Sequence, residues 1–168
     1  ANKAMECLDL IGWEHAAALL PSLIGPMVAA RGAEETTAWR LPVDLLALIE
    51  SALAELPRPA AEDRPRRPWG GHAALGQALL ADDPAAVLAA LTRAMHDGAE
   101  ALDLGRALAY AAALRVARFA TSNEFGDWIT ALHTFTYCNA LHQGLKRLER
   151  PDGTLLSLDP VRGIFHGA

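Results

Sequence analysis

Cysteine and aromatic residues are scarce in this chain of 168 residues. The two cysteines, Cys7 and Cys138, stand far apart and no Cys-x-x-Cys pair is present, so neither a thiol redox pair nor a zinc knuckle is indicated. We expect both to be small buried hydrophobic residues. Aromatic residues make up 6% of the chain, whereas alanine and leucine dominate. Because small side chains let helices approach closely, this composition favours tightly packed helices over a sheet.

Clustered positive charge and long apolar runs are also missing. The net charge is −5 at pH 7, and the one basic cluster, residues 58–67, is interrupted by prolines and acidic residues. A nucleic-acid interface needs a positive face, so none is expected. No apolar stretch has the length that crosses a bilayer, and no secretory signal pattern is seen. We therefore expect a cytoplasmic protein that binds neither nucleic acid nor a membrane.

The sequence lacks the short motifs that usually identify an enzyme. It contains no glycine-rich phosphate loop, no Gly-x-Ser-x-Gly elbow and no His-Glu-x-x-His helix. The Glu-x-x-His pairs of diiron bundles are missing as well. The sequence therefore predicts no particular reaction, and whether the chain is an enzyme stays open.

Helical patterns are what the sequence does contain. Hydrophobic residues that recur three and four positions apart predict helices over about 1–20, 24–38, 43–56, 72–80, 84–98, 102–119 and 126–150, with a last one starting near 159. Asp83-Pro84 and Asp159-Pro160 each combine a capping acid with a proline suited to the first helical turn. We expect an all-α fold, a single-domain multi-helix bundle of about seven or eight helices.

The length fits one domain, 1–168, with a sizeable core. Residues 57–71 are rich in proline, arginine and glycine and form the one linker-like stretch. They would separate an N-terminal helical layer, 1–56, from a C-terminal helical bundle, 72–168. The chain begins with Ala-Asn-Lys, and its last residues read as a helix just starting, so we expect a fragment of a longer chain.

The segment 127–149 is the most informative element, because polar residues are embedded in an otherwise apolar helix. Its apolar side chains cover nearly the whole circumference, which is typical of a buried helix, so we expect it at the centre of the bundle. The embedded polar residues are Thr130, His133, Thr134, Thr136, Asn139 and His142. Buried polar groups must be hydrogen-bonded, so the segment predicts partners on neighbouring helices, ordered water or a ligand in a polar pocket.

His133 and His142 are the candidate ligands of this helix. Nine residues separate them, which puts them on opposite faces and roughly 13 Å apart along the axis, so one straight helix cannot offer both to one metal ion. A divalent metal would use one of them with His15 or Glu35, although Glu35 lies roughly 10 Å from His15 in the expected hairpin. The alternative is that each histidine is structural and is satisfied by a backbone carbonyl or a threonine.

The junction before this helix is a second candidate for ligand binding. Residues 123–128, with Asn123 and Glu124 as the candidate ligands, would form the polar rim of a pocket. The alternative is a capping turn, in which Ser122 or Asn123 satisfies free amides and Glu124 and Asp127 favour the positive end of the helix dipole. The candidate ligand-binding residues are His15, Asn123, Glu124, His133, Asn139 and His142, and the candidate metal ligands are His15, Glu35, His133 and His142.

Three parts of the chain carry a family resemblance. They are LIGWEHA at Leu10–Ala16, TSNEFGDW at Thr121–Trp128 followed by HTFTYCNALH at His133–His142, and RGIFHGA at Arg162–Ala168. Together they resemble the helical part of bacterial proteins labelled as containing a Rieske iron–sulfur domain. The resemblance implies a redox setting and a missing neighbouring segment. A Rieske cluster needs two cysteines and two histidines in paired motifs, which this chain lacks, so no cluster ligands are assigned.

Two hypotheses of different classes follow. In the first, the chain is the helical domain of a redox-associated bacterial protein, with a metal or small ligand in a polar pocket beside helix 127–149. In the second, it is a non-catalytic module for dimerisation or partner docking, in which the alanine-rich face of helix 102–119 packs against a second copy. The first predicts histidines clustered in a concave pocket; the second predicts separated histidines and an exposed apolar patch.

Overall fold

The computed structural model describes residues 2–29, 42–56, 68–148 and 159–168. Within these ranges the chain forms helices joined by turns and no strand, which confirms the predicted all-α fold. Contacts divide the chain into an N-terminal unit, Ala1–Asp44, and a C-terminal unit, Leu45–Ala168. None of the helices in the described ranges combines the length and hydropathy that a bilayer crossing needs.

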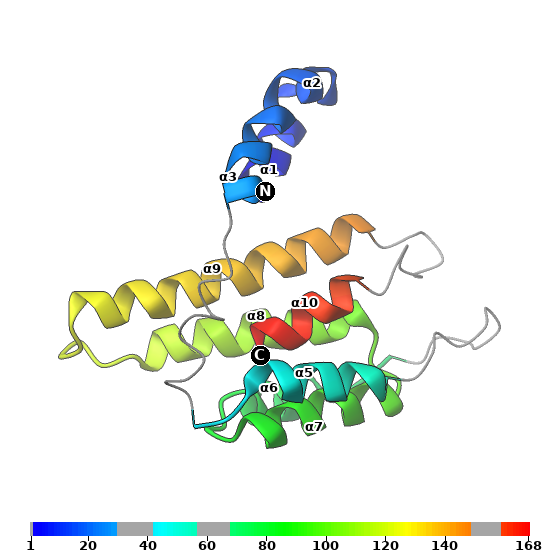
Figure 1. The fold of residues 1–168 in the computed structure, drawn as a ribbon, viewed down its shortest axis with the longest axis vertical. Coiled ribbons are helices and arrows are strands. Elements are labelled where there is room, and N and C mark those ends of the chain that lie inside the picture. Colours follow the sequence, from blue (N-terminus) through cyan, green and yellow to red (C-terminus); the bar gives the residue numbers. More distant parts are fainter. Residues whose placement is uncertain (1, 30–41, 57–67, 149–158) are drawn as a thin grey trace. The chain divides into compact units, whose positions relative to one another are not determined.

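The N-terminal unit is a series of short helices. These are α1 (Asn2–Ile11), η1 (Trp13–His15), α2 (Ala16–Leu19), η2 (Leu20–Leu23) and α3 (Ile24–Ala29), shown in blue in Figure 1. The prediction of one continuous helix over 1–20 was wrong, because Gly12 interrupts it with a φ of 107°, a left-handed conformation that glycine adopts readily. The rest of the predicted helix 24–38, and most of the 57–71 stretch, lie outside the described residues.

The C-terminal unit contains the longer helices. They are α5 (Leu45–Ala54), α6 (His72–Ala78), α7 (Pro84–His96), α8 (Ala101–Arg118), α9 (Phe125–Leu148) and α10 (Asp159–Gly167). Helices α8 and α9 run along each other, α10 lies against both, and α6 packs on α8 (Figure 1). We expected 45–54 in an N-terminal layer, but α5 packs on α7 and α10. The division between the units therefore falls after Asp44 rather than within 57–71.

Side-chain caps fix where two of these helices begin. Asp83 Oδ1 accepts hydrogen bonds from the amides of Ala85 and Ala86 at 2.9 and 3.3 Å, as the Asp-Pro pattern predicted. At the start of α8, Glu100 and Asp103 form a reciprocal capping box, in which the Glu100 amide donates to Asp103 Oδ2 at 3.1 Å. These caps hold the first turns of α7 and α8 in place.

The core of the C-terminal unit combines large aliphatic side chains with alanines, Cys138 and Phe165. At most 1% of the surface of each is exposed for Leu91, Leu104, Leu145, Ile164 and Phe165. Glycines permit the close approach of the helices: a Cβ on Gly105 would collide with Leu145 Cδ1, and a Cβ on Gly167 would lie 2.8 Å from Tyr137 Cε1. Glycine at these positions lets α9 and α10 pack closely on their neighbours.

Helix α9 is present as predicted, but it is not a central buried helix. Its buried residues are Ala131, Cys138 and Leu145, each seven positions from the next. By contrast, Leu132 and Tyr137 are 43% and 46% exposed. A seven-residue spacing puts the buried contacts along one stripe, so most of the circumference of α9 faces outward.

Candidate functional site

The predicted site residues are spread over the two units. His15 ends η1 in the N-terminal unit, and its side chain is 56% exposed. In the C-terminal unit, α9 carries His133, which is exposed, and Asn139 and His142, which are half-buried. Glu35 lies outside the described residues. Asn139 and His142 are thus the two members of the set that share a partly buried side of one helix.

The threonine hydroxyl groups of α9 do not need a ligand, because the backbone of the same helix satisfies them. The hydroxyls of Thr130, Thr134 and Thr136 donate to carbonyls one turn back, at 3.1, 3.0 and 2.7 Å. Such bonds are a common local solution for threonine within a helix. All three threonines are exposed, so the expectation that α9 carries buried hydroxyls into the bundle was wrong.

Metal-ligating side chains do not gather in the described part of the chain. There, no three His, Cys, Asp or Glu side chains are placed to hold one ion. A metal set that includes Glu35 falls partly outside the described residues and stays a prediction. Cys138 is no reactive thiol: it is fully buried, it donates to the Gly167 carbonyl at 3.6 Å, and burial raises its pKa to about 11.

His142 is the member of the predicted set whose surroundings change its acid–base chemistry. Partial burial lowers its pKa below the ordinary value, and the positive charges of Lys146 and Arg106 lower it further. Desolvation and like charge both disfavour the imidazolium form. His142 is therefore a neutral imidazole over a wider pH range than a free histidine.

The junction before α9 has the geometry of a capping turn. Asp127 Oδ2 accepts the Glu124 amide at 3.3 Å, and the Glu124 carbonyl accepts the Asp127 and Trp128 amides at 3.1 and 3.2 Å. The Trp128 ring meets Phe119 edge-on, with centroids 5.0 Å apart. Asn123 is half-buried and Glu124 is exposed. These contacts support the capping interpretation, with Asp127 as the acid that closes the turn.

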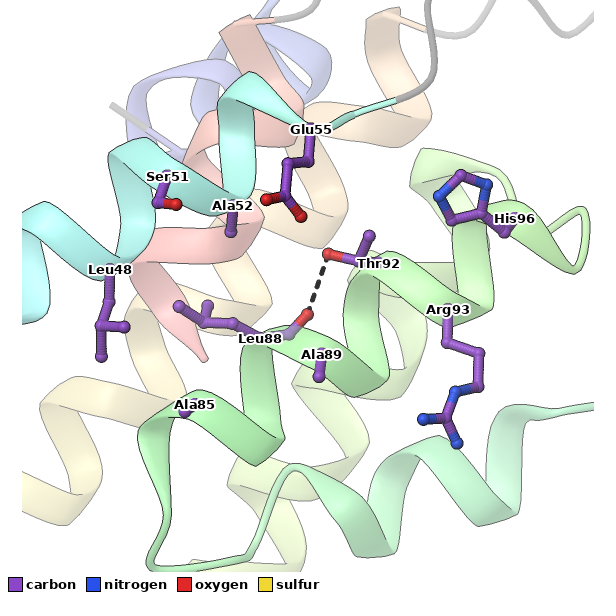
Figure 2. A pocket seen from close by; sticks show the side chains of 10 residues that line it. All are labelled: Leu48, Ser51, Ala52, Glu55, Ala85, Leu88, Ala89, Thr92, Arg93 and His96. Atoms are coloured by element: carbon purple, nitrogen blue, oxygen red, sulfur yellow. Dashed lines mark hydrogen bonds between the residues drawn. The ribbon is translucent and has the colours of Figure 1, made fainter.

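A groove that the sequence analysis missed runs between α5 and α7 (Figure 2). It has a volume of about 450 Å³ and is lined by Leu48, Ser51, Ala52, Glu55, Ala85, Leu88, Ala89, Thr92, Arg93 and His96. The Glu55 carboxylate reaches toward the Thr92 side of α7, whereas the Arg93 side chain points away from α5 (Figure 2). The Thr92 hydroxyl is engaged by the Leu88 carbonyl at 3.0 Å. The groove is therefore apolar at one end and carries its charges at the other.

A second, smaller groove of about 260 Å³ lies between α6 and α8. It is lined by His72, Ala73, Arg106, Ala107 and Tyr110. His72 Nε2 lies 3.5 Å from Asp103 Oδ1, and the ring meets Trp69 edge-on with centroids 4.9 Å apart. His72 Nδ1 is buried and has no hydrogen-bond partner among the described residues.

The sequence contained a signal for this second groove that we did not use. Asp103, Arg106, Ala107 and Tyr110 recur at spacings of three and four, which puts them on one face of α8. His72 lies at a helix end, a position that by itself indicates a capping or solvent-exposed group. Nothing in the sequence paired the two helices, so the juxtaposition was visible only in the structure.

No family model, curated protein or solved structure matches this chain.

Proposed function

We propose that the chain is a non-catalytic helical docking module that self-associates through its N-terminal unit. The observation that carries this proposal is the exposure of large apolar side chains in α1, η1 and α3. Six of them are at least half exposed: Leu10, Ile11, Trp13, Ile24, Met27 and Val28. Leu10 and Val28 reach 87% and 80%. Large apolar side chains exposed in such number are typical of a site of protein interaction.

The energetic reason is the hydrophobic effect. Burying a Leu, Ile or Val side chain that was exposed contributes about 1.5–3 kcal/mol. Within residues 2–29 the one buried side chain is Leu8, so the unit retains most of this free energy for association. A segment this short cannot build a large core of its own.

A second copy of the chain suits this surface because the nearby polar groups are engaged within the unit. Lys3 Nζ lies 2.6 Å from Glu6 Oε2, and Trp13 Nε1 donates to Asp9 Oδ1 at 3.1 Å. An apolar surface can be complementary to itself, as a two-fold symmetric interface requires. The alanine-rich face of helix 102–119, our earlier candidate surface, is unsuitable because Ala107, Ala111 and Ala112 are buried in the C-terminal unit's own core.

The test is the mass of the whole chain in solution, measured by light scattering over a range of concentrations. We expect the wild type to form dimers and the double variant Leu10→Asp with Val28→Asp to be monomeric. Phe125→Asp is the matched control, because Phe125 is 80% exposed but belongs to the C-terminal unit. A wild type that stays monomeric at every concentration contradicts self-association. Dimers that persist in the double variant contradict the proposed surface.

We also propose, from the resemblance, that the chain is the helical region of a larger redox-associated cytoplasmic protein. Two of the resembling segments are in contact, since the Tyr137 hydroxyl donates to the Gly163 carbonyl at 2.9 Å. If the two segments form one packing motif in the proteins that they resemble, a contact of this kind would be part of that motif. The test is to sequence the natural gene around the chain: paired Cys and His motifs in the same reading frame support the proposal, and a complete frame without them contradicts it.

A metal or small ligand beside α9 belongs to this second proposal. His142, half-buried and held in its neutral form, is the residue in that segment with the best chemistry for a metal ligand. Elemental analysis of the purified full chain is the test. Stoichiometric metal that is lost in His142→Ala supports this role, and a metal-free protein excludes it.

A further inference from the structure

We propose that the groove between α5 and α7 binds a small organic ammonium ion with an apolar body, and that the Glu55 carboxylate receives its charged head. Both helices belong to the C-terminal unit, so this inference is independent of self-association through the N-terminal unit. The groove volume of about 450 Å³ lies within the usual range of small-molecule sites, which begins at about 300 Å³.

The two walls of the groove run in the same direction. Figure 2 shows the lining residues of α5 in order from Leu48 to Glu55 and those of α7 from Ala85 to His96. Leu48 lies toward the Ala85 end of the groove, whereas Glu55 lies toward Thr92 and His96. The C-terminal ends of both helices are therefore at the Glu55 end of the groove.

The opposite end of the groove is apolar. It is lined by Leu48, Ala85, Leu88 and Ala89. Ala85 and Ala89 are exposed, and their small side chains leave this part of the groove open. A hydrocarbon group lying over them would remove apolar surface from water, which favours binding. This end suits the apolar body of a ligand.

Glu55 supplies a negative charge that is directed into the groove. Its carboxylate reaches toward α7 in Figure 2, and among the described residues none forms an ion pair with it. On the facing wall the Thr92 hydroxyl donates to the Leu88 carbonyl, so its oxygen can still accept an N–H donor. Arg93, the lining residue with a permanent positive charge, points away from α5.

The backbone adds to this preference for a cation. Helix α5 ends at Ala54 and α7 ends at His96, and the last carbonyls of a helix carry partial negative charge. Both helix ends lie at the Glu55 end of the groove, so they favour the same sign of ligand charge as the carboxylate does. An ammonium group offers N–H donors to these oxygens, whereas a carboxylate ligand would be repelled.

The experiment is an NMR titration of the full chain with phenethylamine, which is a cation at neutral pH. We expect saturable shifts at the amides of Ala52 and Ala89, which line the groove. Phenethyl alcohol has nearly the same shape without the charge and should bind more weakly, and phenylpropionate should bind more weakly still. Added salt should weaken the binding of the amine and leave that of the alcohol unchanged.

Glu55→Gln tests the charged end of the groove. Because Glu55 is exposed, the variant should weaken amine binding about two- to fivefold, the range of an exposed ion pair, and should not affect the alcohol. Asp82→Asn is the matched control, because it removes the same charge from an exposed residue outside the groove. Its affinity for the amine should equal that of the wild type.

Ala89→Leu tests the apolar end without a change of charge. The larger side chain would occupy part of the groove, so saturable binding of both the amine and the alcohol should be lost. Ala86→Leu is the matched control at an exposed position of the same helix outside the lining, and it should bind both ligands as the wild type does. Leucine is a good helix former, so both variants should fold.

Four results each overturn the proposal. The first is the absence of saturable shifts at millimolar amine, and the second is equal affinity for the amine and the alcohol. The third is equal weakening in Ala89→Leu and Ala86→Leu. The fourth is a set of shifts at the Ala52 and Ala89 amides that grow with protein concentration without any amine, because these would assign the groove to a second copy of the chain.

Discussion

The N-terminal and C-terminal units are both helical, but they differ in how much apolar surface their helices bury. In residues 2–29 Leu8 is the buried side chain, while Leu10 and Val28 are almost fully exposed. In the C-terminal unit Leu104 and Phe165 are at most 1% exposed. The α-helices of the first unit have four to ten residues, and those of the second have seven to twenty-four.

This difference shows that a helical pattern and a hydrophobic core are separate properties of a sequence. Short helices give few residues on any one face, so they bury little and depend on tertiary contacts for their stability. The helices of the C-terminal unit are longer and pack more closely. The missing side chains of Gly105 and Gly167 leave room for Leu145 and Tyr137, respectively. The free energy of unfolding should therefore lie mainly in the C-terminal unit, with association stabilising the N-terminal one.

The largest expected effect is the loss of a core side chain on α10. Phe165→Ala should lower the free energy of unfolding of the C-terminal unit by about 3–5 kcal/mol, because it leaves a cavity in a packed core. Urea denaturation followed by circular dichroism measures this loss. Phe125→Ala, at a residue that is 80% exposed, is the control and should change it by less than about 0.5 kcal/mol.

Leu8→Ala tests the same comparison in the N-terminal unit. Leu8 is 0% exposed, yet its removal should affect the N-terminal unit alone and leave the main urea transition unchanged. If Leu8→Ala shifts that transition as far as Phe165→Ala does, the two units unfold together and the comparison fails.

The next effect concerns pH and the buried thiol. Burial raises the pKa of Cys138 to about 11 in the folded chain, from 9.0 for an ordinary cysteine. Between these two values the unfolded chain releases the proton and the folded chain keeps it, so stability is complete below about pH 9 and falls as pH rises. The loss should approach about 2–3 kcal/mol near pH 11.

Urea denaturation at several pH values, for the wild type and Cys138→Ala, isolates this contribution. Below pH 9, Cys138→Ala should have a lower free energy of unfolding than the wild type. Between pH 9 and pH 11, the interval set by the two pKa values, the free energy of unfolding should fall less in the variant than in the wild type. Cys7→Ala, in the N-terminal unit, should keep the wild-type slope. Parallel slopes for the wild type and Cys138→Ala would show that Cys138 does not keep its proton in the folded chain.

A pair of glycine variants measures how much close approach contributes. Gly105→Ala puts a methyl group onto Leu145, which is fully buried, and overpacking of this kind costs about 1–3 kcal/mol. At Gly144, a helical position on α9, a Cβ would meet nothing within 4 Å, so Gly144→Ala should stabilise by about 0.5–1 kcal/mol. Thermal unfolding should shift in opposite directions. A shift of the same sign in both would mean that helix propensity, not packing, decides at these sites.

Local signals in the sequence predicted much of the fold. The Asp83-Pro84 cap, and the spacing of apolar residues, located α7, α8 and α9 to within a few residues. These features depend on residues close together in the chain. Gly12 was an exception, because glycine occurs both inside helices and at their ends. The positive φ of Gly12 in the structure shows that it ends a helix here.

The burial of α9 and the candidate site could not be predicted in the same way. Apolar residues on all sides of a helix do not tell which side meets a neighbour, and Leu132 and Tyr137 are substantially exposed. The threonines looked as if they needed partners, but each bonds to its own helix. The groove at His72 and Arg106 depends on the pairing of α6 with α8, two segments that carry no mutual signal in the sequence.

The smallest expected effect tests whether α9 contributes charge as well as packing to the C-terminal unit. The pKa of His142 is lowered by burial, then by Lys146 and Arg106. Below the ordinary pKa of histidine the unfolded chain therefore binds a proton more readily than the folded chain, and stability falls as pH falls. Lys146→Met removes one of these causes, so the pKa of His142 should be higher in the variant than in the wild type. The variant should therefore lose less stability than the wild type between about pH 7.5 and about pH 5.5. A like-charge pair four residues apart on a helix costs about 0.2–0.5 kcal/mol, which sets the size of the difference.

NMR titration of the His142 ring gives the pKa directly. Arg115→Met, a comparable loss of charge on α8, should leave that pKa unchanged, and an equal rise in both variants would assign the effect to the net charge of the unit instead of to the α9 neighbour.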